Sequence, residues 1–227
     1  MNSQVETQAA VEKKQGAHGE PTFLDVVNSR RSVRKYDPEF VISEEEVKEL
    51  LSIAVKAPSS SNMQPWRFLI VTDPELKQKM LPIAFSQQQV VEASAIVIIM
   101  ADLKMYELSE QIYGAAAEAG YMSEEVKTNM IANSRKMYGG LPADRLRELV
   151  AFDTGLVAMQ LMLAARAKGF DTVPMGGYNR DALKEMFGIP ERYLPTLMLP
   201  IGKAAAPGHP TVRLPIEQIT QVNRFEA

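Results

Sequence analysis

The chain has 227 residues, a formal net charge of −3 and no cysteine. A chain of this length forms one large domain or two small ones. It can bury a hydrophobic core large enough that no disulfide or bound metal is needed for stability. The lack of cysteine excludes disulfide scaffolds, cysteine zinc sites, iron–sulfur clusters and thiol nucleophiles. With 25 basic and 28 acidic residues and no long basic stripe, the chain is not a general nucleic-acid binder.

The sequence has few side chains suited to acid–base catalysis at neutral pH. The sequence has only two histidines, His18 in a polar N-terminal stretch and His209 in a Gly-His-Pro turn. Neither has a neighbouring carboxylate that would orient it as a base. We therefore predict no catalytic side chain and no metal site.

The beginning of the chain gives a domain prediction. Residues 1–21 are polar and are expected to form a flexible tail, and residues 22–227 are expected to form a single domain. No basic and apolar leader is present, so we predict a cytoplasmic protein. The apolar stretch 151–167 contains Asp153, Gln160 and Arg166, and it reads as too short and too polar to cross a membrane.

The first half of the chain predicts two capped helices and two strands. Thr22 can cap a short helix, and Ser43 with Glu46 forms a capping box before an apolar stripe that ends near Pro58. Residues 66–71 read as a strand and Pro74 as the first turn of a helix. Residues 95–100 are all apolar, which is typical of a strand buried on both faces.

The second half is mostly helical. Residues 103–138 have helical composition, and the longest helix runs from Pro142 to about Lys168, where Gly169 ends it. A short extended piece over 170–174, a helix capped by Asn179 and a strand over 197–201 follow. The expected class is α+β, with a small, well-covered central sheet surrounded by helices.

Four segments carry polar groups suited to chemistry, and each also has an ordinary structural explanation. Arg30–Arg34 can grip a phosphate, or merely complement a helix C-terminus. The loop 58–65 can line a flat heterocycle, or simply connect a helix to a strand. Gly176 and Gly177 permit close approach of a planar ligand, or form a tight turn with positive φ. The C-terminal segment contains Lys203, His209 and Arg213. It is ordinary surface unless it folds back towards Arg30 and Arg34, where it could take part in binding.

The longest helix also bears on assembly. Its apolar residues point in every direction between Leu146 and Ala165. A helix that is apolar all round lies either in a core or in a subunit interface. Both interpretations stay open at this point.

In this order and spacing, the segments resemble the nitroreductase family of FMN-dependent NAD(P)H oxidoreductases. The signatures are Arg-Arg-Ser-Val-Arg-Lys-Tyr, Ala-Pro-Ser-Ser-Ser-Asn-Met-Gln-Pro-Trp, Val-Pro-Met-Gly-Gly-Tyr and a late Arg-Leu-Pro, spread from Thr22 to Pro215. The resemblance implies an α+β fold with a small, mostly antiparallel central sheet, and a domain-swapped type of homodimer with FMN sites at the interface. It also implies ping-pong hydride transfer from NADPH or NADH, through FMN, to a nitroaromatic or quinone acceptor.

The resemblance assigns an FMN-binding role to individual residues. Those near the phosphate and the N1/O2 edge of the ring would be Arg30, Arg31, Ser32, Arg34 and Arg213. Those supplied by the partner subunit would be Pro58, Ser59, Ser60 and Asn62. Those along the ring would be Gln87, Pro174, Met175, Gly176 and Gly177. No catalytic side chain is implied, since FMN carries the chemistry.

Two positions depart from the family pattern. Three alternatives to the reductase function also remain open. Gly176 stands where some members have a glutamate, and Thr211 where some have a lysine. The alternatives are a specialised flavin enzyme of the dehalogenase or flavin-destructase type, a non-catalytic FMN-binding dimeric protein, and a fold-level likeness without a cofactor. The lid of a specialised enzyme would be sought in residues 114–140.

Overall fold

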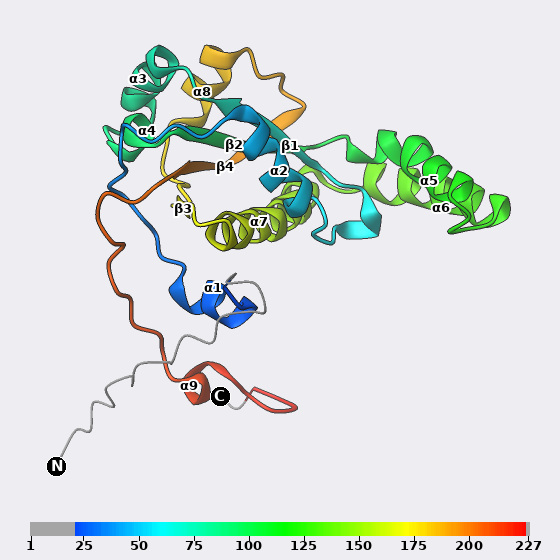
Figure 1. The fold of residues 1–227 in the computed structure, drawn as a ribbon. Coiled ribbons are helices and arrows are strands. Elements are labelled where there is room, and N and C mark those ends of the chain that lie inside the picture. Colours follow the sequence, from blue (N-terminus) through cyan, green and yellow to red (C-terminus); the bar gives the residue numbers. More distant parts are fainter. Residues whose placement is uncertain (1–20, 226–227) are drawn as a thin grey trace.

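The sheet at the centre of the molecule has four strands. The computed structural model describes residues 21–225. The strand order is β1-β2-β4-β3, and all three neighbouring pairs are antiparallel (Figure 1). The strands are β1 (Trp66–Val71), β2 (Ala95–Asp102), β3 (Asp171–Thr172) and β4 (Tyr193–Gly202). This confirms the α+β class with a small antiparallel sheet, whereas the flexible tail predicted for residues 1–21 falls outside the described residues except for Pro21.

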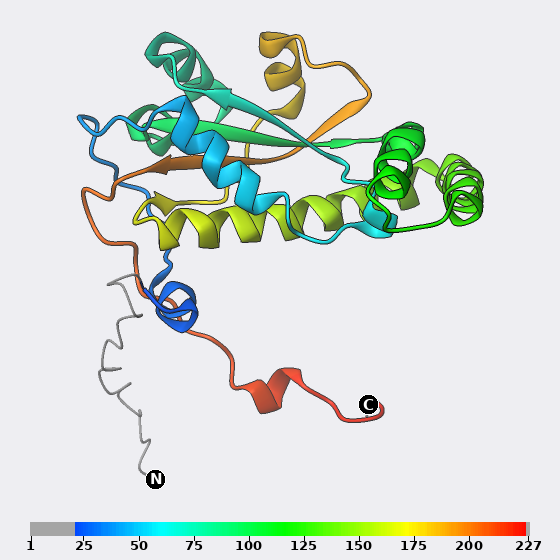
Figure 2. The ribbon, with the colours of Figure 1, turned by 45° about the vertical axis from the view of Figure 1, so that its right-hand side comes forward.

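Helices cover both faces of the sheet. The α-helices are α1 (Phe23–Ser29), α2 (Glu44–Ala54), α3 (Pro74–Ile83), α4 (Gln89–Glu92), α5 (Ser109–Glu118), α6 (Glu124–Gly139), α7 (Ala143–Ala167), α8 (Arg180–Phe187) and α9 (Ile216–Ile219). Two short 3-10 helices are η1 (Ser60–Asn62) and η2 (Met105–Leu108). In Figure 2, α7 and α2 lie on one side of the sheet and α3, α4 and α8 on the other.

Local sequence explains most helix boundaries. Thr22 and Ser43 each form a full capping box with the acidic residue three positions later. Asn179 accepts a hydrogen bond from the third residue of α8. Gly169 and Gly188 follow α7 and α8 with φ of 78° and 60°, a conformation that glycine adopts without a steric cost.

Strand β2 joins the two halves of the core. All eight of its residues are buried. Val97 and Ile99 belong to the cluster that contains Leu161 of α7, while Ile98 belongs to the opposite cluster with Leu183 of α8. Successive side chains of a strand point to opposite faces, so an uninterrupted apolar run serves both clusters. The prediction of a strand buried on both faces is confirmed.

Two boundaries differ from the sequence-based expectation, and two short helices were not expected. Strand β4 begins at Tyr193 rather than at Leu197, because a register shift between Ile99 and Met100 of β2 accommodates Pro195 opposite Met100. Helix α2 ends at Ala54, before Pro58 is reached. The short helices α4 and α9 were not predicted, since one turn of helix carries no periodic signal.

The expectation that the apolar stretch 151–167 is too short and too polar to span a membrane does not hold, on either ground, for the whole of helix α7. Helix α7 has 25 residues, and by length and composition alone it is one helix in the described chain that meets the requirement for a span. Its position argues for a core helix. It packs against α2 and the sheet, and it buries Val157 and Leu161 completely.

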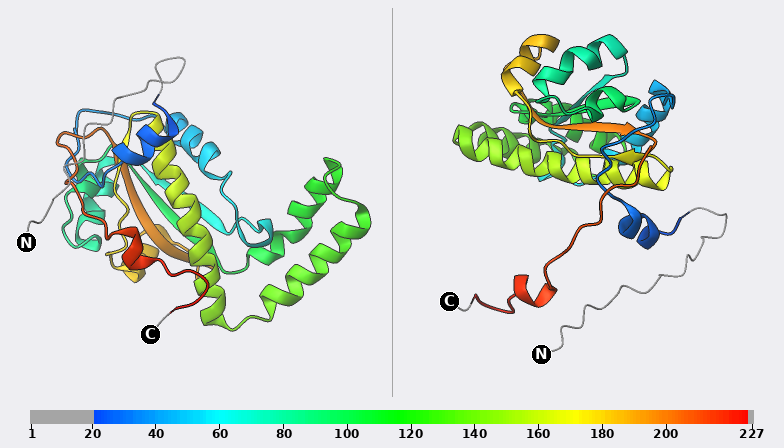
Figure 3. Two further views of the ribbon diagram at one scale, coloured as in Figure 1. Left: turned by 90° about the horizontal axis from the view of Figure 1, so that it is seen from below. Right: turned by 90° about the vertical axis from the view of Figure 1, so that its left-hand side faces the viewer.

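Two parts project from this body. Helices α5 and α6 form a hairpin at one end of α7, and their core includes Tyr113, Tyr138 and Met63 (Figure 3). At the other end, residues 203–225 leave the sheet and pass α1; we call this segment the C-terminal arm. Every arm residue from 209 to 225 is exposed. The apolar side chains among them are Val212, Leu214, Ile216, Ile219, Val222 and Phe225.

Candidate functional site

The arginine-rich segment 30–34 lies beside the edge strand β3. The Val33 N–H donates to the Thr172 carbonyl at 3.1 Å, and Ser32 forms a parallel bridge with Thr172. Val33 and Tyr36 are buried, which anchors the segment while the arginines stay at the surface. Arg166 of α7 donates to the Ser29 hydroxyl at 3.0 Å and so fixes the preceding end of α1.

The C-terminal arm folds back onto this segment. The Ala205 N–H donates to the Lys35 carbonyl at 2.9 Å. Further along the arm, a Cβ built at Gly208 would lie 2.6 Å from Arg31 Cβ and 3.0 Å from the backbone carbonyl oxygen of Ser32. Only glycine permits this approach. The sequence left open whether the arm reaches Arg30, and the structure brings the two together.

The arginines form a cluster of like charge. Burial lowers the pKa of Arg30, and the charges of Arg213 and Arg31 lower this pKa further. Within residues 21–225, no carboxylate pairs with Arg30, Arg31, Arg34 or Arg213; where they are bonded, they donate to backbone carbonyls or to the Thr211 hydroxyl. Guanidinium groups held together without counter-charges favour an anion, and their fork geometry suits phosphate.

The glycine segment follows β3 on the same side of the molecule. Met175 pairs with Met198 of β4 through two hydrogen bonds of 2.8 and 3.0 Å, so its N–H is engaged. Gly176 and Gly177 are exposed, with open space where a Cβ would be. Neither has a positive φ, which excludes the interpretation as a strained tight turn. Within the described chain, their N–H groups have no partner and face an open surface.

Gln87 braces this glycine segment. Its Nε2 donates to the Gly177 carbonyl at 2.9 Å and to the Ala84 carbonyl at 3.0 Å. Its Oε1 accepts from the buried Gln89 at 3.0 Å, so the amide has one orientation. The structure therefore brings Gln87 to the predicted ring segment. Its direct contact with the ring stays a prediction.

The serine-rich loop contacts α7 near its middle, away from the arginine segment. Ser60 donates to Asp153 of α7, whereas the arginine segment is tied to Arg166, thirteen positions further along the same helix. At 1.5 Å per residue, these two points are about 20 Å apart. Within one protomer the structure thus separates Pro58, Ser59, Ser60 and Asn62 from the arginines.

Asp153 is a feature that the site prediction missed. Its side chain is 0% exposed, and it accepts hydrogen bonds from the Ser60 N–H and hydroxyl. Burial raises the pKa of its carboxyl group, and the two Ser60 hydrogen bonds lower it in part. The signal available in the sequence was that Asp153 is the only acidic residue in the apolar stretch 151–167. Gly208 and Gln89 were also missed, and their roles depend on contacts distant in sequence.

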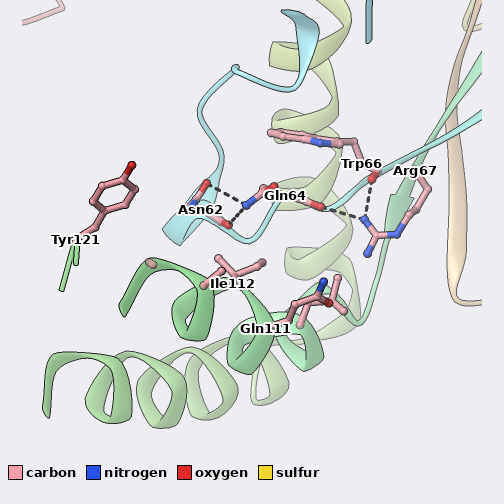
Figure 4. Close-up of a pocket in the computed structure, with 10 residues that line it drawn as sticks. Asn62, Gln64, Trp66, Arg67, Gln111, Ile112 and Tyr121 are labelled. Carbon is pink, nitrogen blue, oxygen red and sulfur yellow. Dashed lines mark hydrogen bonds between the residues drawn. The ribbon is translucent and has the colours of Figure 1, made fainter. Parts of the chain in front are cut away.

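A pocket of about 490 Å³ opens between the serine-rich loop and α5 (Figure 4). Its lining is mostly uncharged: Asn62, Gln64, Trp66, Arg67, Leu108, Gln111, Ile112, Ala115, Ala116 and Tyr121. Arg67 donates to the Gln64 and Trp66 carbonyls and pairs with the buried Asp102 at 2.9 Å. Asp102 also pairs with Arg192, which in turn pairs with Glu107, so two cations and two carboxylates balance here. The pocket therefore suits a flat, uncharged molecule with polar edges.

Comparison with known proteins identifies the class. The model of the nitroreductase family matches residues 27–203. In Bacillus subtilis (strain 168), the protein named "Putative NAD(P)H nitroreductase YdgI" is 48% identical over 201 residues, covering 88% of this chain and 96% of that protein. The chain belongs to the nitroreductase family.

Two further relatives indicate the range of chemistry on this fold. A crystal structure described as a putative nitroreductase in complex with FMN, from Exiguobacterium sibiricum 255-15, has 43% identity and a TM-score of 0.85, with 92% of this chain and 99% of that chain covered. The "CLA biosynthesis enone reductase" of Lactiplantibacillus plantarum is 34% identical over 82% of this chain and 86% of that protein.

Proposed function

We propose that this protein is an FMN-dependent NAD(P)H oxidoreductase that acts by a ping-pong mechanism on nitroaromatic or quinone acceptors. The observation that carries this proposal is the cluster of Arg30, Arg31 and Arg213, which has no carboxylate partner in residues 21–225. The FMN complex of the Exiguobacterium relative supports the same cofactor. The reductase names of the relatives support the reaction class.

The arginine segment is suited to the FMN phosphate. Arg30 and Arg213 would supply the fork-shaped donors, and Arg34 and the Ser32 hydroxyl further ones. Arg31 already donates to the carbonyls of Asn28 and Arg30, so its role would be charge rather than direct contact. Since Thr211 replaces the lysine of some relatives, these arginines carry the anion without it.

The glycine segment is suited to the flavin ring. Bound FMN would supply the hydride chemistry, taking two electrons from NAD(P)H and giving them to the acceptor in a second half-reaction. The free N–H groups of Gly176 and Gly177 would stabilise negative charge on the ring, while Gln87 holds their backbone in place. The buried Met175, which follows Pro174, fixes the segment to β4.

We propose that the site is completed by a second copy of the chain. One protomer holds the arginines and the serine-rich loop about 20 Å apart, too far for one FMN ring and phosphate to use both groups in the expected way. Exposed apolar side chains lie where a partner would bind: Phe23 and Leu24 on α1, Phe152 on α7, and those of the arm. Surfaces of this kind mark protein interfaces.

The pocket beside Asn62 is a suitable place for part of the acceptor or the nicotinamide. Amide groups from Gln64 and Gln111 can bond to carbonyl or nitro oxygens, and Ile112 offers an apolar wall. The residues expected to form a lid, 114–140, build most of the α5–α6 hairpin. An enone is a further acceptor to include, given the Lactiplantibacillus relative. The cytoplasmic location stays a prediction.

The experiment that tests this function is a visible spectrum of the purified protein before and after anaerobic NADPH or NADH. We expect a yellow protein that bleaches with the donor and recovers its colour when a quinone is added. A yellow protein that does not bleach would support the non-catalytic FMN-binding alternative. A colourless protein that takes up no FMN would contradict the proposal.

Gly208→Ala should weaken FMN binding about tenfold, since displacing Arg213 weakens a charged hydrogen bond that contributes about 1.5–3 kcal/mol. The added Cβ meets Arg31 Cβ and the Ser32 oxygen, which are held by the backbone, so the arm must move and take Arg213 with it. Fluorescence titration of the apoprotein with FMN measures the change. Gly114→Ala in α5 is the matched control, because its Cβ meets nothing within 4 Å. Equal affinity of the two variants would contradict the prediction.

A further inference from the structure

Asp153 is a buried carboxylate for which the proposed reaction has no direct use. It lies in the middle of α7, at 0% exposure, among side chains that are otherwise largely apolar. No cation pairs with it in the part of the chain that the structure describes. Burying a carboxylate ion without a cation lowers the free energy of unfolding. An amide or an apolar side chain at the same place would lower it less. Its burial therefore requires a reason other than stability.

The partner of Asp153 is the strained turn of the serine-rich loop. Both carboxylate oxygens lie 3.1 Å from the Ser60 nitrogen, and Oδ1 lies 3.2 Å from the Ser60 hydroxyl. Directly after Ser60, Ser61 and Asn62 have φ of 49° and 55°, and Gln64 has 47°. Residues other than glycine adopt this conformation at a cost, and only when surrounding contacts impose it.

Two tyrosines complete the support of the turn. The Tyr138 hydroxyl is 2.7 Å from the Ser61 hydroxyl, and the Tyr113 hydroxyl donates to the Ser61 carbonyl at 2.8 Å. The turn is thereby held from α5, α6 and α7 together. Asn62 and Gln64, which follow, line the pocket described above. The strain is thus maintained at the rim of a site, which is where strained backbone often has a function.

We propose that Asp153 is a positioning residue for the flavin site of the partner protomer. It holds the turn over Ser60–Asn62 in the conformation that contacts the ring of an FMN whose phosphate is bound by the other chain's arginines. The Ser60 hydroxyl donates its hydrogen bond to the carboxylate, so its oxygen can act only as an acceptor towards any other group that meets it. This inference rests on the proposed function.

Asp153→Asn is the central variant. The amide keeps the size of the side chain but loses one acceptor oxygen, so it cannot reproduce the paired contact with Ser60. We expect FMN affinity to fall about 10- to 100-fold, as for a lost hydrogen bond to a charged group, and the midpoint potential of the bound flavin to shift. Thr154→Val is the matched control: Thr154 is equally buried on α7, but its hydroxyl donates to the Ala151 carbonyl within the helix.

The apoproteins supply the folding control. Both variants should keep a cooperative thermal transition, and only Asp153→Asn should change affinity and potential. If Asp153→Asn does not fold, Ser60→Ala tests the same contact from the loop and should give a smaller loss in the same direction. Wild-type affinity and potential in Asp153→Asn would overturn the inference. A wild-type protein that binds no FMN would instead overturn the proposed function, and the inference with it.

Mixed dimers test whether the effect crosses the interface. A dimer of one Asp153→Asn chain and one chain with Arg30→Ala and Arg213→Ala should retain one flavin of wild-type affinity, because both defects fall in the same site. A dimer of one chain with all three changes and one wild-type chain should retain none. The reverse pattern would mean that the loop serves its own chain's flavin, and it would overturn the inference.

Discussion

Arg30→Ala combined with Arg213→Ala is expected to yield a protein that purifies without flavin. Each lost hydrogen bond between a charged donor and the phosphate costs about 1.5–3 kcal/mol. The pair therefore costs about 3–6 kcal/mol, which raises the FMN dissociation constant roughly 10²- to 10⁴-fold. In the structure the two side chains lie close enough for the charge of Arg213 to lower the pKa of Arg30. Flavin content on purification and apoprotein titration measure the effect.

A control with the same change in charge is available at the other end of the molecule. Arg135 and Arg145 form exposed ion pairs with Glu110 and Glu148. Replacing both by alanine should leave FMN binding nearly unchanged, since exposed pairs contribute little. The first variant should remain a dimer, because neither arginine is part of the apolar surface. Full flavin content in the variant lacking Arg30 and Arg213 would refute the assignment of the phosphate site.

Ile216→Asp combined with Ile219→Asp is expected to convert the proposed dimer into a monomer. Both side chains are exposed in the isolated protomer, at 63% and 59%, although isoleucine is among the residues that proteins most often bury. Burial of an isoleucine contributes about 1.5–3 kcal/mol, and twofold symmetry uses each residue twice, so the dimer loses about 6–12 kcal/mol. Light scattering coupled to size-exclusion chromatography reports the mass.

Loss of the dimer should remove FMN as well, since the serine-rich loop and the arginines then belong to separate particles. The matched control changes the two intervening residues of α9, Glu217→Ala and Gln218→Ala, and should leave a dimer. A dimer that persists in the Ile216 and Ile219 variant would show that α9 is outside the interface. A monomer that keeps FMN at full affinity would contradict the shared site.

Much of the fold follows from short stretches of sequence. The capping boxes at Thr22 and Ser43 set the first turns of α1 and α2 through contacts within four residues. The apolar run of β2 predicted a strand covered on both faces, and the structure has it between two layers of helices. Gly169 ended α7 where expected. These signals are local, so the sequence alone carries them.

The site was predicted as four segments, but the sequence did not determine how they meet. Whether Arg213 approaches Arg30 depends on the arm crossing at Gly208, and that crossing rests on contacts between residues far apart in the chain. The role of Asp153 depends on Ser60, 93 positions earlier. Such contacts leave no periodic pattern, because side-chain periodicity reports only the face of one element.

The sequence by itself determined the class of this protein: the order of its helices and strands, the four polar segments and, through their spacing, the family they resemble. The tertiary structure decided that the arginines of two segments, Arg30–Arg34 and the C-terminal arm, lie together without counter-charges, and that the serine-rich loop lies about 20 Å away along α7. Helix capping and side-chain periodicity act between near neighbours, and they fix the elements. Burial of the apolar faces acts on the whole chain at once, and it fixes how distant charges and turns are brought together or kept apart.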